Sequence, residues 1–285
     1  MAVSGKTKVY GVIGDPIEHS LSPAIQNAAF SASKLDCLFL AFRVKSDDIG
    51  KALSGMRALG IQGLNVTMPH KNAVISFLDE VEQNAKLLNA VNTIKNDDGR
   101  LYGLNTDGVG ALNALRENGV EPKGKKVTLL GAGGAAKAIA FVLAGEVDEL
   151  SIVNRTLQSA ADLANLLYQK FSSKVFAYTL SPLAIKANLA EADLLINASS
   201  VGMKPNVNQS PVPRRWLKKD LAVMDIVYSP VETKLAKDAK ASGAKVVSGV
   251  EMLVYQGAAS FEFWTGRKAP IEVMKKAAIR NLRSV

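Results

Sequence analysis

A lysine and an aspartate that could move a proton stand in two short polar segments of this chain. Lys71 ends the segment Asn65-Val-Thr-Met-Pro-His-Lys71, and Asp107 ends Asn105-Thr-Asp107. Hydride transfer from an alcohol requires a group within hydrogen-bond reach to take the hydroxyl proton, and ketone reduction requires its return. A lysine held by an aspartate fits this task. A structural ion pair would use the same two residues, so the pair alone does not establish catalysis.

Neutral hydrogen-bonding side chains surround the candidate pair in the sequence. Asn65 and Thr67 precede Lys71, and Asn92 lies in Ala90-Val-Asn-Thr93. A cyclic polyhydroxy acid offers one carboxylate and several hydroxyls, so its site needs many neutral donors and acceptors. Such groups reject analogues that would leave them buried and unpaired. The pattern therefore indicates a small polyhydroxylated substrate.

A glycine-rich loop follows the polar segments. Gly131-Ala132-Gly133-Gly134-Ala135-Ala136 matches G-x-G-x-x-G/A between a strand pattern at 125–130 and a helix pattern at 135–144. The first glycine allows a tight turn, the second lets the backbone approach a pyrophosphate, and the small last residue allows close packing. Free amides and the positive dipole at the helix N-terminus suit phosphates. This context favours a dinucleotide site over a ligand-free turn.

The residues after the next strand pattern indicate which dinucleotide binds. An NAD site usually has an acidic residue about 20 positions after the loop, where it bonds the ribose hydroxyls. This chain has Asn154-Arg155-Thr156 instead. Arg155 can pair with a 2′-phosphate that a carboxylate would repel, which favours NADP. The alternative is that Arg155 is only a solvated residue at a helix start.

Composition excludes several other classes of protein. The 285 residues are 48% hydrophobic and 21% charged, a balance typical of globular proteins. Cys37 is the only cysteine and His19 and His70 the only histidines, so neither an intrachain disulfide nor a metal site is expected. We interpret His70 as structural despite its place beside Lys71. No signal-peptide pattern and no apolar run of about 20 residues is present, so we expect a cytoplasmic protein without membrane association.

The net charge of +9 raises the question of nucleic-acid binding. The basic clusters are short and scattered, as at 123–126, 214–219 and 275–283, and no aromatic residues alternate with them. A single-strand platform or a groove-reading helix would need such a pattern. We therefore expect no nucleic-acid partner, and a basic surface that attracts anionic small molecules.

Strand and helix patterns alternate along the whole chain, which predicts an α/β fold with two domains. Ser22 is the expected N-cap of a first helix, with Pro23 at its first position. Asp98-Gly99 between two strand patterns predicts a hairpin and hence a mixed sheet in the N-terminal α/β domain. Residues 108–247 are expected to form a Rossmann-type, doubly wound parallel sheet that binds the dinucleotide. The substrate domain would be residues 1–107, completed by C-terminal helices from 248 to 285.

The motifs in combination resemble the shikimate dehydrogenase family over nearly the whole chain. They include Ser20-Leu-Ser-Pro23, the segments ending at Lys71 and Asp107, Asn154-Arg-Thr156, Asn197-Ala-Ser-Ser-Val-Gly-Met203, Asp225-Ile-Val-Tyr-Ser-Pro230 and Gly249-Val-Glu-Met-Leu-Val-Tyr-Gln256. The resemblance implies reversible NADPH-dependent reduction of 3-dehydroshikimate to shikimate, a step of chorismate and aromatic amino-acid biosynthesis.

The resemblance also implies roles for individual residues. Lys71 and Asp107 would be catalytic. The substrate would be bound by Ser20 and Ser22 at its carboxylate, by Asn65, Thr67, Asn92, Asp107 and Gln256 at its hydroxyls, and by Tyr228 in the pocket wall. NADP would be bound by Gly131, Ala132, Gly133, Gly134, Ala135, Asn154, Arg155, Thr156, Ser199, Ile226, Gly249 and Met252. No metal is implied.

One departure from the family pattern leaves alternatives open. Ser159 stands where NADP-preferring members often have a second basic residue, so discrimination against NAD could be weaker. The nearest alternative is a quinate/shikimate dehydrogenase with broader substrate or NAD use. A non-catalytic NADP-sensing regulator is a second alternative, against which the presence of both Lys71 and Asp107 argues. The oligomeric state is open, a homodimer being one option.

Overall fold

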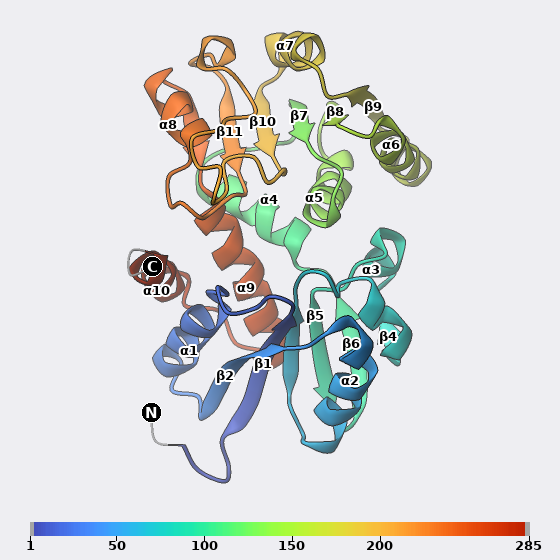
Figure 1. Cartoon of the computed structure of the whole chain (residues 1–285), viewed down its shortest axis with the longest axis vertical. Helices are drawn as coiled ribbons and strands as arrows, with labels where there is room; N and C mark the ends of the chain where they lie inside the picture. The colour runs from blue at the N-terminus through green and yellow to red at the C-terminus, as the bar shows by residue number, and fades with distance from the viewer. Residues whose placement is uncertain (1–2, 283–285) are drawn as a thin grey trace. The chain divides into compact units, whose positions relative to one another are not determined.

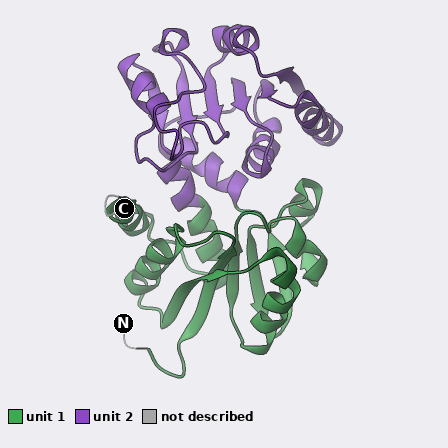
Figure 2. Ribbon diagram, in the orientation of Figure 1, with its two compact units in different colours: residues 1–106, 256–285 green, residues 107–255 purple. Residues whose placement is uncertain are grey.

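The computed structural model describes residues 3–282 and divides into two compact units (Figure 2). Unit 1 contains the chain up to Thr106 and again from Gln256 onward, and unit 2 contains Asp107–Tyr255. The sequence patterns predict boundaries after residue 107 and at about residue 248, whereas the second boundary of the structure lies within a helix. Each unit is built around its own six-stranded sheet (Figure 1).

Unit 1 has a mixed sheet with the order β2-β1-β3-β5-β6-β4. Its strands are β1 (Lys8–Gly14), β2 (Cys37–Arg43), β3 (Gly63–Val66), β4 (Glu80–Val81), β5 (Thr93–Asp97) and β6 (Arg100–Leu104). β1 is parallel to β2 and β3, whereas β5 is antiparallel to β3 and β6. The expected hairpin joins β5 to β6 through Asp98 and Gly99, both at positive φ. The mixed sheet is therefore confirmed.

Helices cover the sheet of unit 1 and bury its apolar side chains. They are α1 (Ser22–Ala32), α2 (Ile49–Ala58), α3 (Gln83–Leu88), the end of α9 (Gly249–Thr265) and α10 (Ile271–Leu282), with 3-10 turns at Ser46–Asp48 and Ala73–Phe77. α10 packs against α1, so the C-terminal segment returns to the N-terminal part of the chain. Leu53 and Met56 of α2 are fully buried in the core of this unit.

The start of α1 differs from the sequence expectation. Leu21 is the N-cap residue, and Ser22 is already the first residue of the helix. Within residues 3–282, no side-chain hydrogen bond caps this end, and the amide of Ser22 instead donates to the hydroxyl of Ser20, 3.3 Å away. A proline is tolerated at either of the first helical positions, so Pro23 does not fix the boundary to one residue.

Unit 2 has an all-parallel sheet with the order β12-β11-β10-β7-β8-β9. The strands are β7 (Lys126–Leu130), β8 (Glu149–Asn154), β9 (Lys174–Thr179), β10 (Leu194–Asn197), β11 (Ala222–Asp225) and β12 (Lys245–Val247). The helices are α4 (Asp107–Glu117), α5 (Gly134–Ala144), α6 (Leu157–Phe171), α7 (Pro182–Glu191), α8 (Lys234–Ala241) and the start of α9, with a 3-10 turn at Arg214–Trp216. The doubly wound prediction is confirmed.

The strand order of unit 2 determines where a ligand can bind. The chain runs outward from β7 to β9 on one side and from β10 to β12 on the other. The loops after β7 and β10 therefore diverge and leave a crevice at the carboxyl edge of the sheet, the usual ligand position in such folds.

Among residues 3–282, no helix has both the length and the apolar character needed to cross a membrane.

Candidate active site

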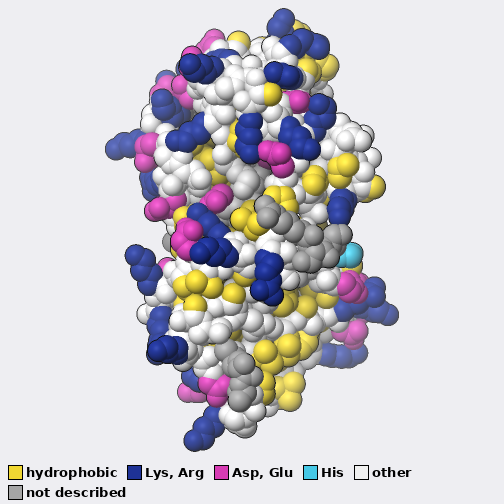
Figure 3. All heavy atoms as spheres, turned by 90° about the vertical axis from the view of Figure 1, so that its left-hand side faces the viewer, with side chains coloured by type: hydrophobic (Ala, Val, Ile, Leu, Met, Phe, Trp, Pro, Cys, Tyr) yellow, Lys and Arg dark blue, Asp and Glu magenta, His cyan; other side chains and the backbone are white. Residues whose placement is uncertain are grey.

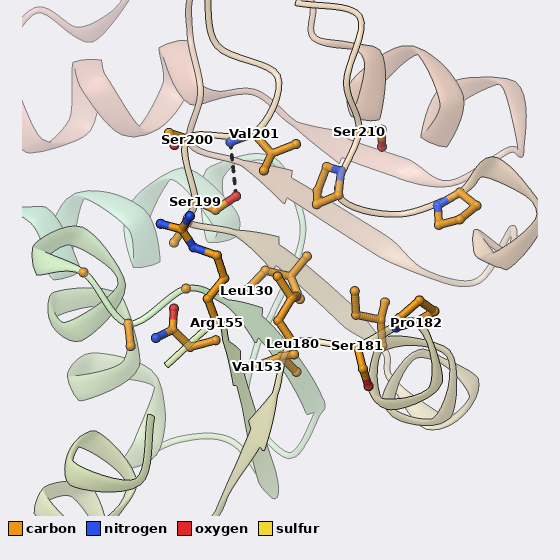
Figure 4. A pocket seen from close by; sticks show the side chains of 18 of the residues that line it. Leu130, Val153, Arg155, Leu180, Ser181, Pro182, Ser199, Ser200, Val201 and Ser210 are labelled. Carbon is orange, nitrogen blue, oxygen red and sulfur yellow. Dashed lines mark hydrogen bonds between the residues drawn. The ribbon is translucent and has the colours of Figure 1, made fainter. Parts of the chain in front are cut away.

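A pocket of about 680 Å³ opens at this carboxyl edge of unit 2 (Figure 4). Its floor is formed by the ends of β7, β8 and β10, and its walls by the loops that follow β9 and β10. The lining residues are Leu130, Gly131, Ala132, Gly133, Val153, Asn154, Arg155, Leu180, Ser181, Pro182, Ile185, Ala198, Ser199, Ser200, Val201, Ser210, Pro211, Pro213 and Trp216. Apolar walls with a few polar groups are typical of small-molecule sites.

The glycine loop forms one side of the pocket. Gly131 has a φ of +113°, and a Cβ there would lie 2.8 Å from the carbonyl oxygen of Ala198 after β10. Gly133 is the N-cap residue of α5, and within residues 3–282 no atom beyond the adjoining backbone lies within 4 Å of a Cβ built on Gly133 or Gly134. Open space therefore lies over the first amides of an 11-residue helix. This cradle fits a pyrophosphate.

Arg155 follows the end of β8, and its side chain lines the pocket (Figure 4). The side chain is exposed, and within residues 3–282 it forms no ion pair. Asn154 donates from Nδ2 to the carbonyl oxygen of Thr156 at 3.0 Å, which braces the turn into α6. Thr156 is the N-cap residue of α6. A guanidinium that no carboxylate neutralises, beside a helix start, suits an anionic group.

The remaining predicted cofactor residues lie elsewhere in unit 2. Gly134 and Ala135 form the first turn of α5. Ile226, after β11, meets Gly249 at the start of α9, where a Cβ would lie 2.5 Å from the Ile226 carbonyl oxygen. Met252 is buried one turn further along α9.

Burial raises the pKa of Tyr228, a predicted substrate residue, so its hydroxyl keeps its proton at neutral pH and can donate a hydrogen bond.

Part of the pocket could not be foreseen from the sequence. This wall includes Leu180, Ser181 and Pro182 after β9, and Ser210, Pro211, Pro213 and Trp216 in the long segment after β10. Ser181-Pro182 is a detectable helix start, and the Ser181 hydroxyl does cap α7 by accepting from the Ala184 amide at 3.1 Å. The segment 210–213 has no periodicity, so no sequence signal puts it beside the pocket.

A buried polar network supports the loops after β10 and β11. Asn197 donates from Nδ2 to Asp225 at 2.9 Å, and its Oδ1 accepts from the Ser199 hydroxyl at 2.6 Å. Asp225 also accepts from the Thr233 hydroxyl at 2.6 Å and from the Val227 amide at 3.1 Å. Burial raises the pKa of Asp225, while these three donors partly oppose that rise. The network holds Ser199, a predicted cofactor residue, in the pocket wall.

Several predicted substrate residues of unit 1 lie at the start of α1 and in the segment after β3. Ser20 and Ser22 lie just before and at the start of α1, both partly buried. Lys71 follows β3, and its carbonyl oxygen accepts from the Val91 amide at 2.8 Å. His70 is buried, and its Nε2 lies 2.6 Å from the Val44 carbonyl oxygen, as a structural histidine would. Thr67 is partly buried, and its amide donates to the Ile13 carbonyl oxygen.

A second polar network in unit 1 joins residues from β3, β5 and α9. Asn65 donates from Nδ2 toward the Thr93 and Ser260 hydroxyls at 3.1 and 3.0 Å. Asn92 accepts at Oδ1 from the Thr106 amide at 2.9 Å. The Ser260 hydroxyl lies 3.1 Å from the carbonyl oxygen of Gln256, the residue one turn earlier on α9. The network thus brings Asn65, Asn92 and the backbone of Gln256 together, partly through the hydroxyl of Ser260, which lies outside the sequence motifs.

Asp107 is the first residue of α4 in unit 2 and is 5% exposed. A carboxylate in the first turn of a helix is stabilised by the helix dipole.

Among the described residues, no group of three or more His, Cys, Asp and Glu side chains could hold a metal ion.

Substitution of Gly131 should damage the loop selectively. Gly131→Ala forces a Cβ against the Ala198 carbonyl oxygen at a φ that side chains rarely adopt. We expect a loss of about 1–3 kcal/mol of stability and weaker NADP binding. Gly145→Ala is the matched control, because Gly145 ends the same helix at a φ of −82°. Thermal unfolding and NADP titration measure both effects, and wild-type values for Gly131→Ala would contradict the proposed role of this glycine.

The titration of the Asp225 carboxyl should change the stability of the folded protein with pH. Because its pKa is raised, the folded protein keeps this proton to higher pH than the unfolded chain. The Asp225 carboxyl therefore stabilises the folded protein most at low pH. This stabilisation decreases as the pH rises from about 4, the ordinary pKa of an aspartate, through the raised pKa of the folded protein. Asp225→Asn lacks this titration, so the stability difference between wild type and variant should shrink with rising pH. Denaturant unfolding from about pH 4 to 8 tests this, and parallel curves would contradict it.

Comparisons with known proteins agree with the geometry of both units. Residues 12–94 match the family described as shikimate dehydrogenase substrate binding domain, residues 114–242 match shikimate / quinate 5-dehydrogenase, and residues 249–279 match the shikimate 5'-dehydrogenase C-terminal domain. The chain is 48% identical to the shikimate dehydrogenase (NADP(+)) of Methanopyrus kandleri over 99% of both chains.

Solved structures give the same result. A crystal structure of a shikimate dehydrogenase in complex with NADP+ superimposes with a TM-score of 0.93 at 42% identity, covering 99% of this chain and 98% of the other. The shikimate 5-dehydrogenase of Listeria monocytogenes, in complex with shikimate and NAD, gives 0.92 at 37% identity over 97% and 98%. The chain belongs to the shikimate dehydrogenase family.

Proposed function

We propose that this protein catalyses the reversible NADPH-dependent reduction of 3-dehydroshikimate to shikimate. The observation that carries the proposal is the pocket of unit 2, in which the glycine cradle meets Arg155, a cation without an ion-pair partner in residues 3–282, at the topological switch point. The near-complete coverage of NADP-dependent relatives supports it. The activity is a step of chorismate and aromatic amino-acid biosynthesis, and we assign it to the cytoplasm.

The cofactor would be held by groups that match its parts. The cradle of residues 131–135 would bind the pyrophosphate, and Arg155 with Thr156 the 2′-phosphate. Asn154 and Ser199 would line the ribose region, and Ile226, Gly249 and Met252 the nicotinamide region. When bound, NADPH supplies the hydride. The protein contributes position and a path for the proton.

The substrate would be bound chiefly by neutral groups of unit 1. We assign Ser20 and Ser22 to the carboxylate, Asn65, Thr67, Asn92 and Gln256 to the hydroxyls, and Tyr228 to a further contact with the substrate. Such groups discriminate strongly, because an analogue that lacks a hydroxyl leaves a buried donor or acceptor unpaired. The network around Asn65 and Asn92 supports this assignment, since it holds both amides in defined orientations.

Lys71 and Asp107 would handle the proton. In the reduction direction, the Lys71 ammonium donates a proton to the carbonyl oxygen as negative charge develops there. In the oxidation direction, the neutral amine takes the proton back from the hydroxyl. The Asp107 carboxylate would accept a hydrogen bond from a hydroxyl of the substrate. Both roles follow from the family motifs.

The charge distribution suits two anionic ligands. On the face drawn in Figure 3, Lys and Arg side chains are scattered, with Asp and Glu among them. The net charge is nevertheless +9. A positive net charge raises the encounter rate with an anionic cofactor and an anionic substrate.

Use of NAD or quinate is a second candidate. Ser159 lies in the first turn of α6, where it provides no second basic group beside Arg155. The relative from Listeria monocytogenes was crystallised with NAD. Initial rates with shikimate and quinate, each with NADP and NAD, decide between the two. The proposal requires the highest kcat/KM for shikimate with NADP.

Removal of the Lys71 amine should affect the chemical step. We expect Lys71→Ala to lower kcat by roughly 10²- to 10⁴-fold, the range for a general acid–base group, with a much smaller change in shikimate KM. Lys86→Ala, at an exposed position of α3, is the control for removing a lysine. Steady-state kinetics in both directions measure the effect. A large rise in KM at near-normal kcat would reassign Lys71 to binding.

Removal of the Arg155 guanidinium should affect cofactor choice. A charge-assisted hydrogen bond contributes about 1.5–3 kcal/mol, so Arg155→Ala should weaken NADP roughly 10- to 150-fold. NAD lacks the 2′-phosphate and should lose little. Lys170→Ala, at the exposed far end of α6, is the matched control. The assignment is falsified if the NADP-to-NAD ratio of kcat/KM stays within about threefold of wild type.

A further inference from the structure

The network under the proposed substrate residues of unit 1 contains two wholly buried hydroxyls. Thr93 on β5 and Ser260 on α9 are both 0% exposed, whereas Asn65 beside them is 6% exposed. Thr93 lies directly opposite Asn65 across the β3–β5 pair, and Ser260 lies 195 positions away in the sequence. The two hydroxyl oxygens are 2.8 Å apart. Buried polar groups of this kind must satisfy one another, because they are not accessible to bulk water.

The orientation of the Asn65 amide follows from a backbone contact. Nδ2 lies 3.2 Å from the carbonyl oxygen of Asn92, which can only accept a hydrogen bond. The nitrogen must therefore face inward, together with its contacts to Thr93 and Ser260. A flipped amide would place two acceptor oxygens against each other. Within residues 3–282, no protein donor reaches Oδ1 of Asn65.

The direction of the hydrogen bonds is fixed at the other end of the network. Asn92 Oδ1 accepts from the Thr106 amide at 2.9 Å, and a backbone amide can only donate. The Thr93 hydroxyl donates to the same oxygen at 2.9 Å. The Thr93 and Ser260 hydroxyls share a hydrogen across their 2.8 Å contact, and the Ser260 hydroxyl also lies 3.1 Å from the Gln256 carbonyl oxygen, which can only accept. The hydrogen bonds therefore link the Asn65 amide, both hydroxyls and Asn92 in one connected network.

We infer that Thr93 and Ser260 are positioning residues, which hold the Asn65 amide so that its carbonyl oxygen is presented to the substrate as an acceptor. This inference rests on the proposed function and adds a specificity element to it. The ring position that meets Asn65 must carry a hydrogen-bond donor, as a hydroxyl does. An ether or fluorine at that position has no hydrogen to donate to the carbonyl oxygen of Asn65, which would then stay unpaired.

The test compares two substitutions of one residue. Thr93→Val keeps the shape of the side chain and removes the hydroxyl, whereas Thr93→Ser keeps the hydroxyl and removes a methyl group. We expect Thr93→Val to lower kcat/KM for shikimate about 10- to 100-fold, mainly through KM, because a buried donor and acceptor lose their partner. Thr93→Ser should stay within about threefold of wild type, and KM for NADP should change less than about twofold in both. Thr128→Val, at a buried strand threonine of β7, is the control.

A double variant separates positioning from general destabilisation. If Thr93 acts through Asn65, Thr93→Val should have little further effect on shikimate kcat/KM in an Asn65→Ala background, whereas independent effects would multiply. The unfolding midpoint of each variant confirms that the compared proteins are folded. Wild-type behaviour of Thr93→Val, equal losses in Thr93→Val and Thr93→Ser, or multiplying effects in the double variant would each overturn the inference. Absence of shikimate turnover by the wild-type protein would overturn the proposed function and the inference with it.

Discussion

A buried amide side chain must find hydrogen-bond partners inside the protein. The buried polar network of each unit meets this requirement. In unit 1, the side-chain nitrogen of Asn65 and the amide of Asn92 are satisfied by hydroxyls and backbone groups next to β5, after β6 and on α9. In unit 2, Asn197 is satisfied by Ser199 and Asp225. An unpaired group at any of these positions costs about 1–3 kcal/mol, a large part of the stability of a domain. The same bonds that keep the units folded therefore also orient the candidate binding groups.

The parallel sheet of unit 2 imposes a second constraint. All six strands point the same way, so the loops that follow β7, β8 and β10 emerge at one edge. Close approach of two of these loops leaves no space for a side chain at Gly131. Arg155 has no carboxylate partner among residues 3–282, so a cation is available at the same edge. Backbone geometry thus supplies the cradle, and a single side chain supplies the charge.

Much of this architecture could be predicted from local sequence. The Asp98-Gly99 hairpin and the strand–loop–helix around Gly131 depend on a few adjacent residues with strong conformational preferences. Elements without such signals escape prediction. α3 has six residues and β4 has two, too short to show a period. α1 begins one residue earlier than predicted, because serine and proline are both acceptable at several neighbouring positions. The second unit boundary, inside α9, has no local signal at all, since a continuous helix runs through it.

Residue types and spacing specify the two kinds of sheet, the nucleotide loop, the cation at position 155 and the family motifs, because each depends on residues that are neighbours in the chain. The pairing of buried polar groups depends instead on the folded arrangement. Ser260 bonds Asn65 across 195 positions, and Trp264 donates to the Ile94 carbonyl oxygen across 170. The pocket wall at Ser210, Pro211, Pro213 and Trp216 likewise arises from the path of a loop around the sheet. Hydrogen-bond partners are selected by proximity after folding, and proximity between distant segments cannot be read from the order of residues in one chain.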